Sequence, residues 1–350
     1  MYPKYSENVL WWGSLSENIV KAPVLTFPAS RYQRSNPDSV LASFEPGCRA
    51  LSFQQKAERD SRVDMLKKSG KTIYDETTYV MNSMVVDPVI SLHCGTGKYF
   101  DTIGSCTALV SEFYSKTPPD NNLANLPLRN EAHKNCTIDP IVDGSARSAA
   151  IGLSTLIVYQ DTDGTYKYFV RRRSEKVAQH PGALHVLPAS MFQPKEHLSN
   201  PEREFSVVQN VKCEYLEELF NIREENVSRD PARNSISLIP EGKYLEEMLA
   251  DPNRAQLLFT GVAMDLSNLR PEICTLLLIQ DQEWIQKIKG VEGHKPMQMN
   301  WEYSAEIPFD KKGQIPLDAP IIKTLGPVTD FVPVGAAAVS LGIKVALEEI

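Results

Sequence analysis

The sequence predicts a mixed α/β fold, and three features of its second half indicate this most directly. Two β-rich runs flank the dipeptide Asp163-Gly164, which is a strong hairpin signal between strands. Two further apolar runs, "AQLLFTGVAMDL" and "EICTLLLIQD", have the length and composition of buried strands. Segments 200–222 and 333–350 instead place apolar residues at helical spacing, so we expect strands and helices to alternate.

The first half is predicted to mix helices, strands and more loop. A helix is expected from about Arg49 to Gly70, because glycine commonly ends a helix. Strands are expected in "TTYVMNSMVV" and "PVISLHC". Residues 117–148 are rich in Pro, Asn and Asp and lack periodicity, which predicts a long connection. We therefore expect an N-terminal α/β extension over residues 1–148 and a second domain over residues 149–350.

Composition and charge limit the classes of protein that fit. A chain of 350 residues with a net charge of −7 and no evident helix-turn-helix disfavours nucleic-acid binding. The six cysteines are scattered without a CxxC pair, which indicates reduced thiols and a cytoplasmic protein. No apolar run approaches the roughly 18 residues of a membrane span, and the first residues lack a secretory signal. These patterns give no oligomeric state.

The stretch "CEYLEELFNI" carries the candidate site. On a helix, Glu214, Glu217 and Glu218 stand at positions i, i+3 and i+4 and therefore share one face. An apolar stripe lies a quarter to a third of a turn away, so the helix can pack while the acids converge. Three carboxylates suit Mg²⁺ or Mn²⁺, which prefer oxygen ligands. The alternative is an acidic face exposed to solvent, which is the usual role of a charge run.

A second stretch, "KYLEEML", nearly repeats these letters and serves as a comparison. Lys243 stands where the third acid would be, so Glu246 and Glu247 lack the acidic triad. The helix of the first stretch is expected to start at Asn200 and Pro201 and to follow a strand and a loop, whereas the second stretch lacks such an upstream strand and loop. The third acid and the preceding strand and loop therefore distinguish a candidate site from a surface helix.

The context of the first stretch resembles the Nudix hydrolase family. The strand ending in "FVRRRSEKV" places Arg172 and Arg173 on the family's arginine strand, and Pro181–Gly182 and Pro188 match its loop landmarks. The three glutamates then fall on the acids of the Nudix box that bind catalytic metal. The segment "FTGVAMDLSNLRPEICTLLLI" and, faintly, "YFDTIGSC" are similar to elements of the branch that cleaves UDP-glucose. The resemblance implies an α/β/α sandwich with a mixed sheet over residues 149–350, with insertions near 193–200 and 223–256.

The sequence departs from the family pattern at several supporting positions. Cys213 stands where the box has the arginine that braces the catalytic glutamate, and Ala189 and Ser190 replace two loop glycines. Phe205 occupies the position of a fourth acid, with Glu204 one residue away. Because groups that orient metal ligands are worth 10–100-fold in metal affinity or activity, these changes predict weakened turnover.

The resemblance implies metal-dependent hydrolysis of a nucleoside diphosphate linked to another group, NDP-X. Mg²⁺ or Mn²⁺ on the three glutamates would neutralise the pyrophosphate and activate water. Arg171, Arg172, Arg173 and His180 are candidates for substrate contacts, although strand alternation puts Arg172 on the opposite face from its neighbours. The rival interpretation is a Nudix-like module that binds a nucleotide with little or no hydrolysis. A third is an interaction protein with an incidental acidic helix.

Overall fold

The computed structural model describes residues 2–12, 20–47, 50–116, 126–168, 170–177, 179–288, 315–319 and 324–350. Its main sheet has the strand order β1-β2-β11-β12-β6-β7-β13, with β10 paired to β6. Strands β12 and β6 run parallel, while the other neighbours run antiparallel, so the sheet is mixed. A separate three-stranded sheet has the order β3-β5-β4, and β8 pairs with β9.

The elements have the following bounds. The strands are β1 (Val9–Trp12), β2 (Val20–Pro28), β3 (Leu41–Phe44), β4 (Thr77–Val85), β5 (Ser91–Lys98), β6 (Gly152–Gln160), β7 (Tyr166–Tyr168), β8 (Arg171–Arg172), β9 (Leu184–His185), β10 (Ala189–Met191), β11 (Ala255–Asp265), β12 (Arg270–Ile279) and β13 (Ile315–Pro316). The helices are α1 (Arg31–Arg34), α2 (Phe53–Lys68), α3 (Tyr99–Thr102), α4 (Ala108–Lys116), α5 (Pro127–Asn135), α6 (Val207–Phe220), α7 (Pro240–Leu249), α8 (Glu283–Ile288) and α10 (Pro333–Glu349).

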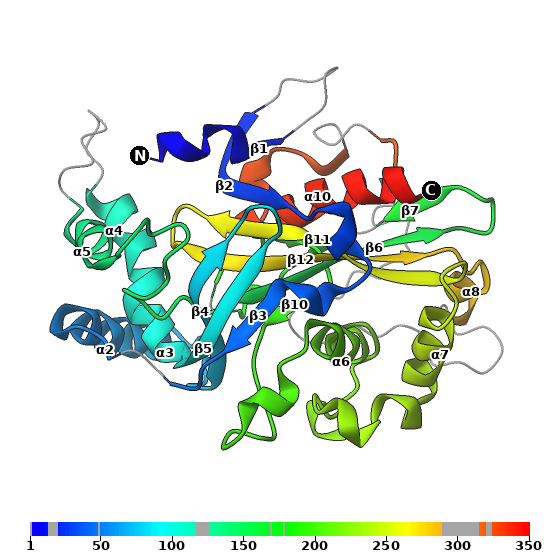
Figure 1. Ribbon diagram of the computed structural model, residues 1–350, viewed down its shortest axis with the longest axis horizontal. Helices are drawn as coiled ribbons and strands as arrows, with labels where there is room; N and C mark the ends of the chain where they lie inside the picture. The colour runs from blue at the N-terminus through cyan, green and yellow to red at the C-terminus, as the bar shows by residue number, and fades with distance from the viewer. Residues whose placement is uncertain are drawn as a thin grey trace.

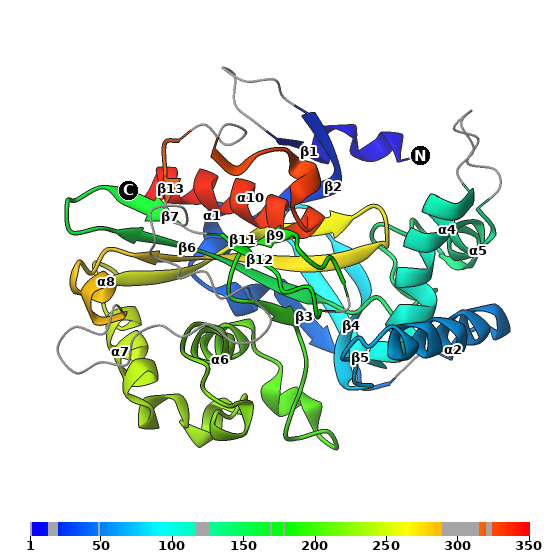
Figure 2. The same ribbon diagram turned by 180° about the vertical axis from the view of Figure 1, so that it is seen from behind.

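Helices cover both faces of the main sheet (Figures 1 and 2). Successive residues of a strand point to opposite faces. In β6, Leu156 and Val158 accordingly pack in the core formed with α10, whereas Ile157 and Tyr159 pack in the core formed with α6, α7 and α8. This arrangement confirms the predicted α/β/α sandwich with a mixed sheet.

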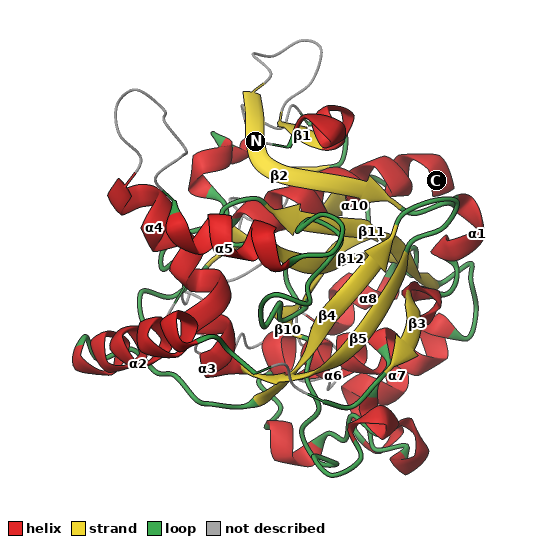
Figure 3. Cartoon of the chain, turned by 60° about the vertical axis from the view of Figure 1, so that its left-hand side comes forward, coloured by secondary structure: helices red, strands yellow, loops and turns green. Residues whose placement is uncertain are grey.

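The N-terminal part forms its own small sheet and also joins the main one (Figure 3). Strands β3, β5 and β4 lie beside the main sheet and share a core with it that contains Tyr79, Met81, Leu153 and Ile273. Strand β2 pairs antiparallel with β11 inside the main sheet. Strands from both sides of the predicted boundary at residue 148 therefore share one sheet, and the boundary itself stays a prediction.

The predicted strands in the second half are confirmed, including the hairpin of β6 and β7 and the long antiparallel pair of β11 and β12. The predicted closing helix is α10. The predicted insertion at 193–200 lies between β10 and α6 along the chain. The predicted insertion at 223–256 comes after α6 and contains α7. Within the described ranges, no helix is long and apolar enough to cross a membrane.

Three predicted boundaries were wrong. The helix expected to start at Asn200 is a short turn, Pro201–Glu204, that ends at Phe205, and α6 begins only after Ser206. The helix expected from Arg49 begins at Phe53, because Ser52 and Gln55 form a reciprocal capping box there. The connection expected over residues 117–148 contains α5. Of the six cysteines, Cys48 lies outside the described residues, and the other five are free thiols.

Candidate functional site

Both ends of the acidic helix α6 are held by specific contacts. The Ser206 side chain accepts a hydrogen bond from the backbone of Gln209. Asp38, from the N-terminal part, accepts hydrogen bonds from the backbone of Val207 at 2.6 Å and from the Ser206 hydroxyl at 2.9 Å. A carboxylate at a helix N-terminus satisfies otherwise unpaired N–H groups and complements the helix dipole. At the other end, Asn221 adopts the left-handed conformation that commonly closes a helix.

The three glutamates of α6 line one cavity of about 530 Å³. Glu214 and Glu218 are 7% and 2% exposed, so the structure does not present them as a solvated acidic face. The side chain of Glu217 is 15% exposed. Buried carboxylates are stable only when a cation or hydrogen-bond donors offset the cost of burying their charge.

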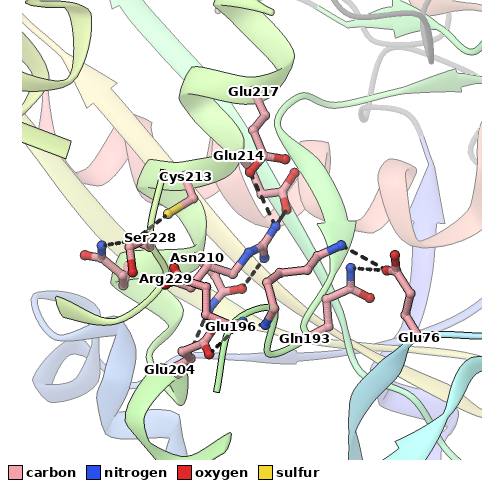
Figure 4. A network of polar contacts seen from close by, with 12 residues as sticks. Glu76, Gln193, Glu196, Glu204, Asn210, Cys213, Glu214, Glu217, Ser228 and Arg229 are labelled. Atoms are coloured by element: carbon pink, nitrogen blue, oxygen red, sulfur yellow. Dashed lines mark hydrogen bonds and ion pairs between the residues drawn. The ribbon is translucent and has the colours of Figure 1, made fainter. Parts of the chain in front are cut away.

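Arg229 provides that compensation for two of the three glutamates (Figure 4). Its guanidinium donates to Glu214 Oε1 at 2.6 Å and to Asn210 Oδ1 at 2.5 Å. Its Nη2 also lies 3.6 Å from Glu217 Oε1. The Arg229 side chain is 1% exposed, so this is a buried, charge-assisted network rather than a surface ion pair.

The position of Arg229 explains how the helix accommodates Cys213. The Cys213 thiol donates to the backbone carbonyl of Ser228 at 3.5 Å, and Gln209 Nε2 donates to the same carbonyl at 2.9 Å. Burial raises the pKa of the Cys213 thiol, so it stays neutral. The cation that the resemblance places at position 213 therefore comes here from Arg229, one residue beyond the carbonyl that Cys213 contacts.

Glu218 connects α6 to the short strand β10, which contains Ala189 and Ser190. Its Oε2 accepts a hydrogen bond from the Ala189 backbone N–H at 3.0 Å, and both groups are buried. Ala189 and Ser190 themselves belong to β10, which pairs with β6. Ala189 and Ser190 replace the two glycines that the resemblance implies, but β10 is still held against α6 by this hydrogen bond.

The arrangement does not match a shared metal site as it stands. Across the described ranges, no group of three His, Cys, Asp or Glu side chains is placed to hold a metal ion. Glu214 and Glu217 face a guanidinium, and Glu218 accepts from a backbone amide. The three carboxylates therefore do not fit a common divalent cation, and Mg²⁺ or Mn²⁺ stays a prediction from the resemblance.

The predicted substrate-binding residues divide into two groups. Arg173 and His180 line the cavity, and Arg171 and Arg172 are not among its lining residues. Arg172 is exposed and donates to the Gly182 carbonyl, while Arg171 is buried and donates to the Val170 carbonyl. Only one arginine of the three thus reaches the cavity, which is within the one or two that strand alternation allowed.

A further buried carboxyl group, that of Glu272, also lines the cavity. Glu272 is 8% exposed and accepts a hydrogen bond from Ser154 Oγ at 2.5 Å. Burial raises the pKa of Glu272 to about 7, although Ser154 and Arg270 act in the other direction. Gly152 makes room for this carboxyl, because a Cβ at Gly152 would lie 1.9 Å from Glu272 Oε2. This acid is therefore partly protonated near neutral pH.

The N-terminal part supplies a further wall of the same cavity. Glu76 accepts from Lys195 Nζ and Gln193 Nε2, both at 2.9 Å (Figure 4). Burial alone would raise the pKa of Glu76, but Lys195 and Gln193 hold it below its ordinary value. Tyr74 and Tyr99 line this wall as well. The site is consequently built from both halves of the chain.

Sequence reasoning missed several residues of this site. Arg229, Glu76 and Asp38 lie in loops or short turns that carry no motif. The one available signal was indirect: three acids on one helical face, with Cys213 at the arginine position, require a cation from another segment. Glu204, the acid beside the predicted fourth position, is not on α6 and instead accepts from the backbone amides of residues 195–197.

Comparisons with known proteins add little to this geometry. No family model matches the chain, and no curated protein matches it. Two solved structures found by shape are a Nudix hydrolase from M. smegmatis, RenU, and a NUDIX hydrolase from Alicyclobacillus acidocaldarius. They share 8% and 12% identity over 57% of this chain and over 88% and 96% of their own, each with a TM-score of 0.25. With TM-scores this low the likeness carries no argument, nothing supports the branch that cleaves UDP-glucose, and the functional argument rests on the site itself.

Proposed function

We propose that the cavity binds a small anionic ligand of the nucleoside diphosphate class, NDP-X, and that the protein acts as a receptor for it with little or no hydrolysis. The observation that carries this proposal is that three residues lining the cavity have buried polar atoms without hydrogen-bond partners among the described residues: Arg173 Nε, Ser190 Oγ and His185 Nδ1. Buried polar groups are normally paired, so such atoms mark a ligand position.

The chemistry of these atoms favours phosphate oxygens. Arg173 is a permanent cation that presents several donors, and Ser190 adds a hydroxyl donor. Burial lowers the pKa of His185 well below its ordinary value, so its imidazole is neutral and contributes a hydrogen bond rather than a charge. The volume of about 530 Å³ lies in the range of small-molecule sites, and Tyr74 and Tyr99 offer aromatic surface to a base or sugar.

Hydrolysis of the same ligand is the second candidate. It is favoured by the three glutamates, which line the same cavity as Arg173. It is disfavoured by the ion pair of Glu214 with Arg229, because a metal would need that carboxylate released. In either case Arg173 and Ser190 are proposed to hold the phosphates, and Glu272 is placed to hydrogen-bond as a neutral acid.

Calorimetric titration of nucleoside diphosphate sugars, ADP-ribose and dinucleotides tests the proposal, with chromatography of each mixture to detect cleavage. We expect binding of at least one of these compounds, and Arg173→Gln should raise its Kd by about 10- to 100-fold. Arg172→Gln is the matched control, because Arg172 is an adjacent arginine outside the cavity lining, and it should leave Kd unchanged. Equal effects of the two variants, or cleavage at many turnovers per site, would contradict the receptor proposal.

A further inference from the structure

We infer that Arg229 is a built-in counter-ion of the α6 carboxylates, so that ligand binding in this cavity does not require a divalent metal. The inference rests on the proposed function for the identity of the site, and it goes further by assigning the cation. It starts from a disagreement: the acid spacing on α6 predicts a metal, whereas the carboxylates in the structure face a guanidinium.

The guanidinium is held by hydrogen bonds to two side chains, and the residue before Arg229 is held through its backbone. Asn210, which is fully buried, accepts from Nη1 at 2.5 Å, while Glu214 accepts from Nη2 at 2.6 Å. The preceding residue, Ser228, is held through its carbonyl by Gln209 and through its N–H by the Ser235 hydroxyl at 2.7 Å. Such a side chain has little freedom to move aside for another cation.

The next residue anchors the segment from the other direction. Asp230 accepts from the backbone of Ala232 at 3.0 Å and pairs with Arg203 at 2.5 Å, and His197 Nε2 lies 3.1 Å from the same carboxylate. Arg229 is therefore held in a segment whose neighbours on both sides are pinned. Residues 228 and 230, on either side of Arg229, are thus both held by hydrogen bonds or ion pairs.

The charge of the site leads to the same conclusion. Three carboxylates at i, i+3 and i+4 repel one another, and a nearby cation relieves that repulsion. Arg229 does so for Glu214 and Glu217, and removing its partner would leave a buried unpaired charge. A divalent cation must displace the guanidinium from Glu214, so we expect metal affinity on the order of 100-fold weaker than in a variant without Arg229.

This assignment is tested by titrating the full chain with Mn²⁺ and measuring the concentration of free Mn²⁺ by electron paramagnetic resonance. The wild type should show no saturable site below about 1 mM, the concentration range in which weak metal sites are detected. Arg229→Gln should gain one site, and Arg229→Gln combined with Glu217→Gln should lose it again. Arg254→Gln is the matched control, since Arg254 pairs with Asp281 outside the cavity and should gain nothing.

A saturable wild-type site that disappears in Glu217→Gln would overturn the inference, and so would a folded Arg229→Gln variant without a gained site. Circular dichroism of Arg229→Gln reports whether it folds. If it does not fold, the titrations of the wild type and of Glu217→Gln decide the matter. A saturable site in the wild type contradicts the inference, and the absence of such a site supports it.

A second arm separates this inference from the proposed function. ADP-ribose and UDP-glucose are titrated into the wild type in EDTA and again in Mg²⁺. Equal affinity in both conditions supports the counter-ion role, and binding only in Mg²⁺ overturns it while leaving the ligand proposal intact. Absence of binding in both conditions contradicts the ligand proposal, and the Mn²⁺ titration then still decides the role of Arg229.

Discussion

Helices α6 and α7 contain the same four letters, Tyr-Leu-Glu-Glu, and use them differently. In α6 the two acids are Glu217 and Glu218, which line the cavity. In α7 they are Glu246 and Glu247, whose side chains are 28% and 53% exposed and pair with lysines. Ion pairs that water can reach contribute little to stability, and the two α7 pairs are partly or largely exposed, whereas a buried arginine partner is essential once the acids are buried. The environment around the helix, and not its letters, separates a site from a surface.

Removing the cationic partner of an acid on each helix should test this comparison most strongly: Arg229 for Glu214 of α6, and Lys212 for Glu246 of α7. Arg229→Met leaves Glu214 buried without its partner, so we expect the free energy of unfolding to fall by about 3–5 kcal/mol. Lys212→Met removes the lysine partner of Glu246 and should cost less than about 1 kcal/mol. Urea denaturation of both variants measures the difference. Similar losses would mean that the Arg229 network is no more important than a surface pair.

Another buried acid of the cavity, Glu272, should make the stability of the protein depend on pH. The pKa of Glu272 is about 7 in the folded protein, above its ordinary value of 4.5, so the folded state binds the proton more tightly. Stability is therefore expected to decrease as pH rises from about 4.5 to about 7. Glu272→Gln removes this dependence and should stabilise the protein at pH 8 by an amount of the order of 3 kcal/mol.

Thermal unfolding of Glu272→Gln at pH 5 and pH 8 checks this expectation, with Glu247→Gln as the exposed control. The gain should be present at pH 8 and much smaller at pH 5. If both variants changed with pH in the same way, the burial of Glu272 would not be the cause.

The last glutamate of each tetrapeptide offers the smallest and most direct test. Glu218→Ala removes the acceptor of the buried Ala189 N–H, which should cost about 1–3 kcal/mol. Glu247→Ala removes a carboxylate whose nearest lysine nitrogen lies 3.9 Å away, and it should change stability by less than about 0.5 kcal/mol. Chemical denaturation at one pH suffices, and a loss in Glu247→Ala as large as that in Glu218→Ala would remove the distinction between the helices.

The sandwich could be predicted because the sequence of each element by itself indicates a strand, a hairpin or a helix. Strands β11 and β12 are long apolar runs, the β6–β7 hairpin has an Asp-Gly turn, and α10 has helical spacing over 17 residues. Each of these signals is complete within one segment, so no knowledge of the rest of the chain is needed. The start of α6 was mispredicted because Asn200 and Pro201 resemble a helix start but open only a short turn.

The site could be predicted only in part, because its partners come from distant segments. The spacing of the three glutamates places them on one face, and the structure puts all three at one cavity. The cation beside them lies 15 residues after Glu214, in a loop whose path depends on packing. Glu76 directly precedes β4 of the smaller sheet, and no local pattern encodes its contact with Lys195.

The pairing of β2 with β11 has a consequence for how this chain is made. Pro28 lies opposite Gly261, so the two strands are separated by roughly 230 residues of sequence. At a synthesis rate of about 5–20 residues per second, β2 leaves the ribosome about 10–50 s before its partner. During that time β1 is already available to pair with β2, but the buried residues Val24, Leu25 and Phe27 lack the neighbouring strand β11. The nascent chain therefore carries an apolar segment that chaperones are suited to shield until translation reaches β11.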